Sequence, residues 1–95
     1  MARYARITGW GKYLPERVLT NRDLERIVNT DDAWISSRTG IKERRIADPG
    51  ETASSLAVRA SADALRVAGL KHDDLDLVIA ATCTSEHIFP ACAAL

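Results

Sequence analysis

The chain has 95 residues, of which 46% are hydrophobic and 27% charged, a balance that is typical of a globular domain and argues against disorder. Thirteen basic and thirteen acidic side chains cancel, so the charge favours neither a nucleic acid nor a membrane surface as partner. The longest apolar run, residues 77–81, is far shorter than the roughly 20 residues of a membrane-spanning helix. The first residues lack the apolar segment of a secretory signal, and two cysteines are too few for a disulfide framework. We therefore expect a cytoplasmic protein.

Two segments of the first half are predicted to be strands. Residues 4–14 are rich in β-forming side chains, and they contain Gly9 and Gly11. Glycine within a strand is typical of a bulge or of a close approach by another backbone. Residues 41–47 also predict a short, exposed strand.

Two short helices are predicted between these strands. The string Thr20-Asn21-Arg22-Asp23 is a capping pattern that predicts a helix to about residue 28. Thr30 precedes two carboxylates, Asp31 and Asp32, so we expect its hydroxyl to cap a second helix. Gly40 is expected to end that helix.

The clearest predicted element is a helix over residues 51–68, closed by Gly69. Its apolar positions recur every three or four residues and are mostly alanine, which permits close approach to a sheet or another helix. The apolar run 77–81 does not alternate, as in a strand buried on both faces, so a strand–helix–strand unit is expected. Residues 90–95 resemble the first turn of another helix, and we therefore expect a part of a larger fold.

Two cysteines and a histidine near the end of the sequence are candidates for chemistry. Cys92 lies at a predicted helix start, where the dipole favours a thiolate, although a small buried apolar role is the more common one. Cys83 follows the predicted buried strand, at an end where α/β folds place ligands. His87 lies near both, but no third residue that would orient a Cys/His pair is evident. The spacing of these residues does not indicate a metal site.

Trp34 and Arg38 are four residues apart and therefore lie on one helix face. An indole beside a guanidinium can stack a purine and contact its phosphate, although a tryptophan on a short helix more often belongs to a core. Neither a dinucleotide-binding glycine motif nor a P-loop is present.

Several motifs together resemble a known family. They are Tyr13-Leu14-Pro15, Thr20-Asn21-Arg22-Asp23-Leu24, Trp34-Ile35-Ser36-Ser37-Arg38-Thr39-Gly40-Ile41-Lys42-Glu43-Arg44 and Ala80-Ala81-Thr82-Cys83-Thr84-Ser85 with His87, Phe89 and Pro90. In order and spacing they resemble the N-terminal portion of β-ketoacyl-acyl carrier protein synthase III, over essentially all of residues 1–95.

The resemblance implies an α/β fold, namely the N-terminal part of a thiolase-like layered αβαβα fold that is incomplete as a stand-alone domain. Residues 1–95 would form one segment of that domain without an internal boundary. Family members are cytoplasmic homodimers that condense an acyl-CoA starter with malonyl-acyl carrier protein to initiate fatty-acid synthesis. The resemblance implies no cofactor, because acyl-CoA is a substrate.

The resemblance also assigns roles to four side chains. Trp34 matches the position that stacks on the adenine of coenzyme A, Arg38 one that contacts its phosphates, and Thr30 one that bonds the base. Phe89 lies on a loop that crosses the dimer interface and shapes the partner's acyl pocket. The family's nucleophilic cysteine, in an Ala-Cys-x-Gly segment, and its histidine and asparagine lie beyond the matched region. No catalytic residue and no metal ligand is therefore expected here, and residues 1–95 alone should be inactive.

Two departures from the family pattern stand near these positions. Ala33 replaces an acidic residue before the tryptophan, and Cys83 replaces a second threonine. Two alternatives remain open: a related thiolase-fold acyltransferase that starts polyketides or joins acyl chains, and a non-catalytic module that binds coenzyme A or a nucleotide.

Overall fold

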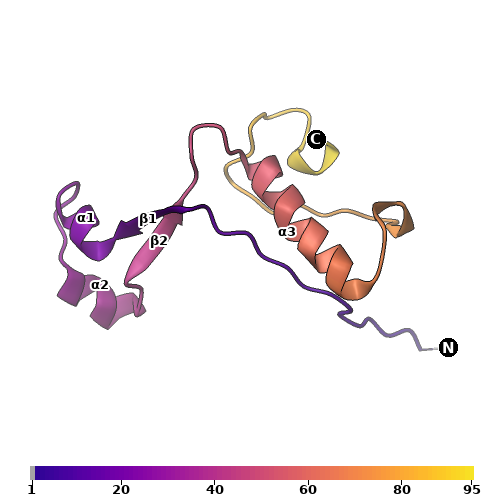
Figure 1. The fold of residues 1–95 in the computed structure, drawn as a ribbon, viewed down its shortest axis with the longest axis horizontal. Coiled ribbons are helices and arrows are strands. Elements are labelled where there is room, and N and C mark those ends of the chain that lie inside the picture. The colour runs from indigo at the N-terminus through magenta and orange to yellow at the C-terminus, as the bar shows by residue number, and fades with distance from the viewer. Residues whose placement is uncertain (1) are drawn as a thin grey trace. The chain divides into compact units, whose positions relative to one another are not determined.

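The computed structural model describes residues 2–95, which form two compact units (Figure 1). Residues 14–50 form one unit, called here the inner unit, and the segments before and after it form the other, called the outer unit. No helix of the described residues is long and apolar enough to cross a membrane.

The inner unit is built on a two-stranded antiparallel sheet of β1 (Arg17–Thr20) and β2 (Glu43–Ile46). Arg17 lies opposite Ile46, and Thr20 lies opposite Glu43. The strand predicted over residues 41–47 is confirmed by β2. Its partner β1 was not predicted, because four residues between a proline and a helix cap carry too little periodicity to stand out.

Two helices complete the inner unit: α1 (Asn21–Glu25) and α2 (Asp32–Thr39). The predicted cap of α1 is confirmed, because Thr20 and Asp23 form a reciprocal capping box, but the helix ends before residue 28. The predicted end of α2 is also confirmed, since Gly40 adopts φ 71°. The predicted cap at Thr30 is wrong. Asp31 caps α2 instead, and its Oδ1 accepts the Trp34 N–H at 2.7 Å.

The outer unit is organised around α3 (Ala53–Ala68), which confirms the long predicted helix to within two residues. Thr52 caps it by accepting the Ser55 N–H, and Gly69 ends it at φ 71°. Two 3₁₀ turns follow, η1 (His72–Asp74) and η2 (Cys92–Ala94). The helix expected at residues 90–95 is therefore only a single 3₁₀ turn.

The predictions of strands at residues 4–14 and 77–81 are wrong for this chain, and so is the strand–helix–strand unit. Neither segment pairs with another strand, because β1 and β2 form the one sheet of the described residues. A strand needs a neighbour that accepts and donates its backbone hydrogen bonds. The run 77–81 is also not buried, since Leu77 is 76% and Ile79 80% exposed.

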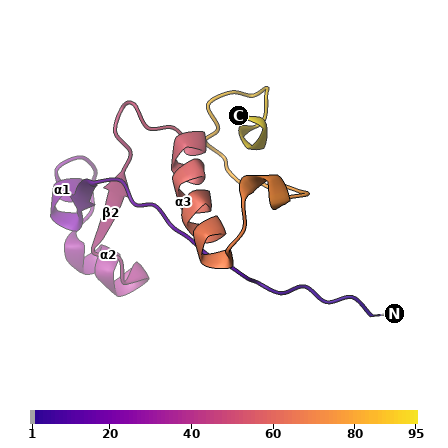
Figure 2. The same cartoon turned by 45° about the vertical axis from the view of Figure 1, so that its right-hand side comes forward.

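The N-terminal segment instead packs against α3, and both ribbon views show it running beside the helix (Figures 1 and 2). A Cβ built on Gly9 would lie 2.8 Å from Ala68 Cβ, and one built on Gly11 would lie 2.6 Å from the Ala64 nitrogen. Real Cβ atoms essentially never come this close. Gly9 and Gly11 therefore lie where another backbone approaches closely, which is one of the roles expected of a glycine in this segment. The alanine stripe of α3 forms the other side of the contact.

Gly11→Ala tests this contact. The added methyl group has no free space, so we expect the free energy of unfolding to fall by about 1–3 kcal/mol, as for other overpacked sites. The measurement is urea-induced unfolding of the protein expressed from the complete reading frame. Gly50→Ala is the matched control, because a Cβ there meets nothing within 4 Å. Equal stability of the two variants would contradict the close packing.

Candidate ligand-binding site

Helix α2 presents an aromatic ring and a cation on one exposed face. Arg38 Cζ lies 5.6 Å from the centroid of the Trp34 ring, within the range of a cation–π contact. Trp34 is 56% exposed, so it does not belong to the core. The core position of this helix is Ile35, which is 7% exposed. The juxtaposition predicted for Trp34 and Arg38 is therefore present, and it leaves the indole open to a ligand.

A small cavity adjoins Trp34. It has a volume of about 240 Å³ and is lined by Asn29, Thr30, Asp31 and Trp34. Thr30 Oγ1 is buried and has no hydrogen-bond partner among the described residues. A buried polar atom without a partner is uncommon in native proteins and costs about 1–3 kcal/mol. The cavity therefore contains a polar group that a ligand can satisfy.

A buried asparagine holds α2 against the rest of the inner unit. Asn21 is 2% exposed, and its Nδ2 donates to Asp32 Oδ1 at 2.7 Å and to the Ile41 carbonyl at 2.8 Å. Its Oδ1 accepts from Arg44 Nη2 at 2.8 Å, and its backbone N–H donates to the Lys42 carbonyl at 3.0 Å. The amide thus connects the start of α1, the start of α2 and the approach to β2. This network fixes the direction in which α2 carries Trp34.

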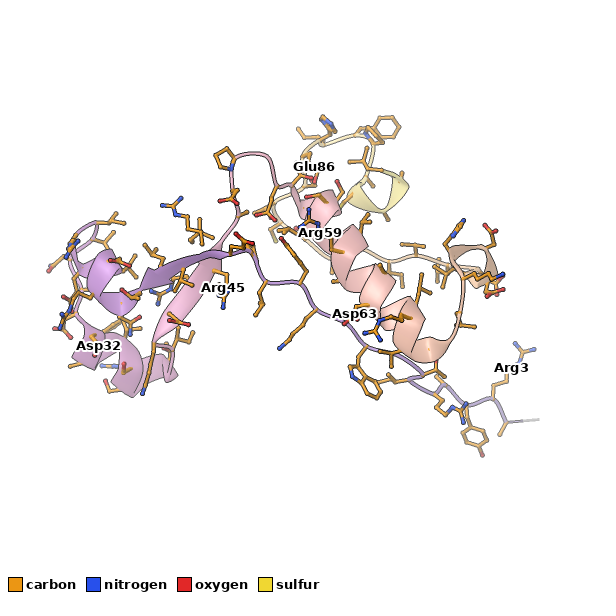
Figure 3. The ribbon with its side chains drawn as sticks, viewed as in Figure 1. Arg3, Asp32, Arg45, Arg59, Asp63 and Glu86 are labelled. Atoms are coloured by element: carbon orange, nitrogen blue, oxygen red, sulfur yellow. The ribbon has the colours of Figure 1, made fainter. Side chains whose placement is uncertain are left out.

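Asp32, labelled in Figure 3, is the acidic member of that network. Hydrogen bonds from Asn21 and then from the Ser36 hydroxyl hold the pKa of its carboxyl below the ordinary value. The Glu25 carboxylate of α1 accepts the Asp32 N–H at 2.8 Å, so Glu25 joins Asp31 and Asp32 at the positive end of the α2 dipole.

The other residues singled out from the sequence lie in the outer unit. Phe89 is 90% exposed on the loop before η2, and Cys92 is buried. Cys83 is exposed, so the chain has two free thiols in different surroundings. The hydrogen bonds of this part of the chain do not link His87 to either cysteine. Among residues 2–95, no group of three His, Cys, Asp or Glu side chains is placed to hold a metal ion.

Sequence reasoning missed Asn21 and Asp32 as supports of this site. Asn21 was interpreted only as part of a capping string and Asp32 only as a carboxylate of a first helical turn, which are the common roles of these residue types next to a helix start. Their contacts with Arg44, Ile41 and each other span 11–23 positions in the sequence. The local pattern contains no signal for bonds of that separation.

Asn21→Ala tests the network. It removes both amide groups, and with them one hydrogen bond each of Asp32, Ile41 and Arg44, so we expect the free energy of unfolding to fall by about 1–3 kcal/mol. Asn29→Ala is the matched control, because Asn29 is exposed. Urea-induced unfolding at neutral pH checks the difference. Similar values for the two variants would show that Asn21 does not hold the unit together.

The lowered pKa of Asp32 predicts how the stability of the fold depends on pH. A carboxyl whose folded pKa lies below its unfolded value of about 3.9 stabilises the fold fully above that pH, and the stabilisation is lost as pH falls further. We therefore expect the stability difference between the wild type and Asp32→Asn to shrink as pH is lowered from 6 to 3. Urea titrations across that range measure it. A difference independent of pH would mean that the Asp32 charge contributes nothing.

Several curated proteins that are similar to this chain are β-ketoacyl-[acyl-carrier-protein] synthases III. A β-ketoacyl-[acyl-carrier-protein] synthase III of Roseiflexus sp. (strain RS-1) is 59% identical over 93 residues, which is 98% of this chain and 28% of that protein. The protein of the same name from Caldanaerobacter subterraneus subsp. tengcongensis is 56% identical over 91 residues. No protein-family model matches the chain.

Solved structures agree with these relatives. The 3-oxoacyl-[acyl-carrier-protein] synthase III from Aquifex aeolicus VF5 superposes with a TM-score of 0.86 at 55% identity, over 93% of this chain and 28% of that one. The priming β-ketosynthase from the R1128 polyketide biosynthetic pathway gives a TM-score of 0.89 at 37% identity, over 97% and 28%. The expected relation to thiolase-fold condensing enzymes is thereby confirmed. By sequence and by fold the chain is thus similar to the β-ketoacyl-acyl carrier protein synthases III, and it spans about 28% of the length of the relatives it matches.

Proposed function

We propose that the chain is the N-terminal segment of a cytoplasmic enzyme that condenses an acyl-CoA starter with malonyl-acyl carrier protein and so initiates fatty-acid synthesis. The observation that carries the proposal is the 59% identity to a synthase III over 98% of this chain. The segment supplies part of the coenzyme A site and no nucleophile. By itself it is therefore inactive in condensation.

The geometry of α2 supports a role in binding coenzyme A. The exposed indole of Trp34 offers a flat apolar face for the adenine ring. The Arg38 guanidinium, 5.6 Å from that ring, supplies the positive charge that a phosphate requires. The cavity of about 240 Å³ is smaller than the roughly 300–1,000 Å³ of a pocket that encloses a whole ligand, so it suits one part of a large ligand.

Thr30 completes this proposed subsite. Its buried Oγ1 lacks a partner in the described part of the chain, and it stands beside the same cavity as Trp34. A hydroxyl is both donor and acceptor, so it can pair with a ring nitrogen or an exocyclic amine of a purine. The three side chains thus have different roles in the proposed subsite. Trp34 stacks on the adenine ring, Thr30 forms a hydrogen bond with the edge of the base, and Arg38 contacts phosphate.

Phe89 is assigned to the acyl pocket and the dimer interface of the complete homodimeric enzyme. Its exposure of 90% supports this, because a phenyl ring left in water favours burial against another surface. No cofactor is proposed, because acyl-CoA is a substrate.

A polyketide-starting acyltransferase is the second candidate, supported by the TM-score of 0.89 with a priming ketosynthase. The identity to that protein is 37%, against 55% for the synthase III from Aquifex aeolicus, and this difference favours fatty-acid synthesis.

Substitutions on α2 test the proposed subsite in the protein expressed from the complete reading frame. Trp34→Ala removes a stacking surface that is worth about 1–3 kcal/mol for a base, so we expect the KM for acyl-CoA to rise about tenfold. kcat should stay nearly unchanged, because the lost contact is remote from the reacting atoms. Arg38→Ala should have a similar effect that weakens at high salt.

Trp10→Ala is the matched control, because Trp10 is a second exposed tryptophan, at 69% exposure, and lies on the outer unit. It should leave the KM unchanged. Turnover without any change of KM in Trp34→Ala and Arg38→Ala would reject the subsite. Coenzyme A binding without turnover of acyl-CoA by the wild type would favour a binding module.

A further inference from the structure

The loop that carries Phe89 is tied to the start of α3 by one carboxylate. Glu86 Oε1 accepts the Ser54 N–H at 2.7 Å, and Glu86 Oε2 accepts the Ser54 hydroxyl at 2.5 Å. Figure 3 shows Glu86 beside the first turn of the helix. The contact joins positions 32 residues apart within the outer unit. Both carboxylate oxygens are engaged by a single serine, so the loop position next to Glu86 is fixed in distance and direction.

Glu86 also supplies a negative charge that the first turn of α3 lacks. The first turns of α1 and α2 contain their own acidic residues, Asp23 and Asp32, whereas the first turn of α3 contains none. Thr52 already satisfies the Ser55 N–H, which leaves the Ser54 N–H for another acceptor. Glu86 provides that acceptor and places a negative charge at the positive end of the dipole. The side-chain and backbone hydrogen bonds of Ser54 accordingly lower the pKa of Glu86.

The loop has a second fixed point at Cys92, which is 9% exposed and begins η2. Between Glu86 and Cys92, the side chains of Ile88 and Phe89 are 104% and 90% exposed. The Ser85 hydroxyl donates to the His87 carbonyl at 2.9 Å and tightens the loop beside Glu86. The loop is therefore held at Glu86 and at Cys92, and between them it exposes the large apolar side chains of Ile88 and Phe89.

We propose that Glu86 is a positioning residue, which anchors the loop to α3 through Ser54 and thereby sets where Phe89 stands in the acyl site. The part of this inference that concerns acyl binding rests on the role proposed for Phe89. The anchor itself rests only on the contacts of Glu86.

Hydrogen exchange tests the anchor without any substrate. In the protein expressed from the complete reading frame, Glu86→Ala should make the backbone amides of residues 84–91 exchange about threefold faster or more. Thr52→Ala is the matched control, because it weakens the same helix start by removing its cap, while the two groups of Ser54 that bond Glu86 are retained; the Thr52 Oγ1 itself lies 3.3 Å from Ser54 Oγ. Equal exchange of residues 84–91 in Glu86→Ala and the wild type, or the same increase in Thr52→Ala, overturns the anchor.

Acyl-chain selectivity tests the positioning role. We expect Glu86→Ala to change the ratio of kcat/KM for a short and a long acyl-CoA by about fivefold. Glu86→Gln should restore the wild-type ratio, because its amide can accept the Ser54 N–H and donate to the Ser54 hydroxyl. Thr52→Ala should leave the ratio unchanged although it lowers stability.

The outcomes separate the two proposals. An unchanged ratio in Glu86→Ala, in an enzyme whose wild type turns over acyl-CoA, overturns the positioning role alone. A wild type without acyl-CoA turnover overturns the proposed function and the acyl-site role together, whereas the exchange experiment still decides the anchor.

Discussion

A single buried amide organises the inner unit. Asn21 is 2% exposed, yet its side-chain amide bonds Asp32, Ile41 and Arg44, and its backbone N–H bonds Lys42. Because buried polar groups are costly when unpaired, each partner must keep its place for the others to be satisfied. The exposed pair of Trp34 and Arg38 depends on this arrangement, since α2 is oriented by a bond at its first residue. A site made of surface side chains thus owes its geometry to a residue that contacts no ligand.

The outer unit depends on a different kind of contact, in which two residues without side chains pack against a helix. Gly9 and Gly11 let an extended backbone lie against the alanines of α3 at a distance that excludes any Cβ. The contact leaves no room for a side chain at either glycine, so its specificity comes from shape. The Glu86 carboxylate, from the loop before η2, accepts hydrogen bonds at the N-terminal end of the same helix. Helix α3 therefore has one partner along its length and another at its N-terminus.

Sequence patterns over a few neighbouring residues predicted the helices well. The features that these patterns did not predict depend on partners that are distant in the sequence. The end of α2 at Gly40 and the span of α3 follow from short-range patterns of caps and periodicity, which the neighbouring residues alone determine. The segment 77–81 has the composition of a buried strand, but strand formation depends on a neighbour that its own residues do not specify. The pairing of Trp34 with Arg38 was predictable from helical spacing. The contributions of Asn21 and Glu86 were not, because their partners lie 11–32 positions away.

The division into two units has a consequence for the order of folding. Residues 14–50 are contiguous, whereas the outer unit combines a segment before them with one after them. At the junction, the Tyr13 hydroxyl donates to Glu51 Oε2 at 2.9 Å across 38 positions. Once the inner unit is formed, the loop that separates these two residues is already closed, so the entropy lost on joining the outer segments is smaller. During synthesis the glycine segment leaves the ribosome before α3 does, and it can contact α3 only after the whole inner unit has been made.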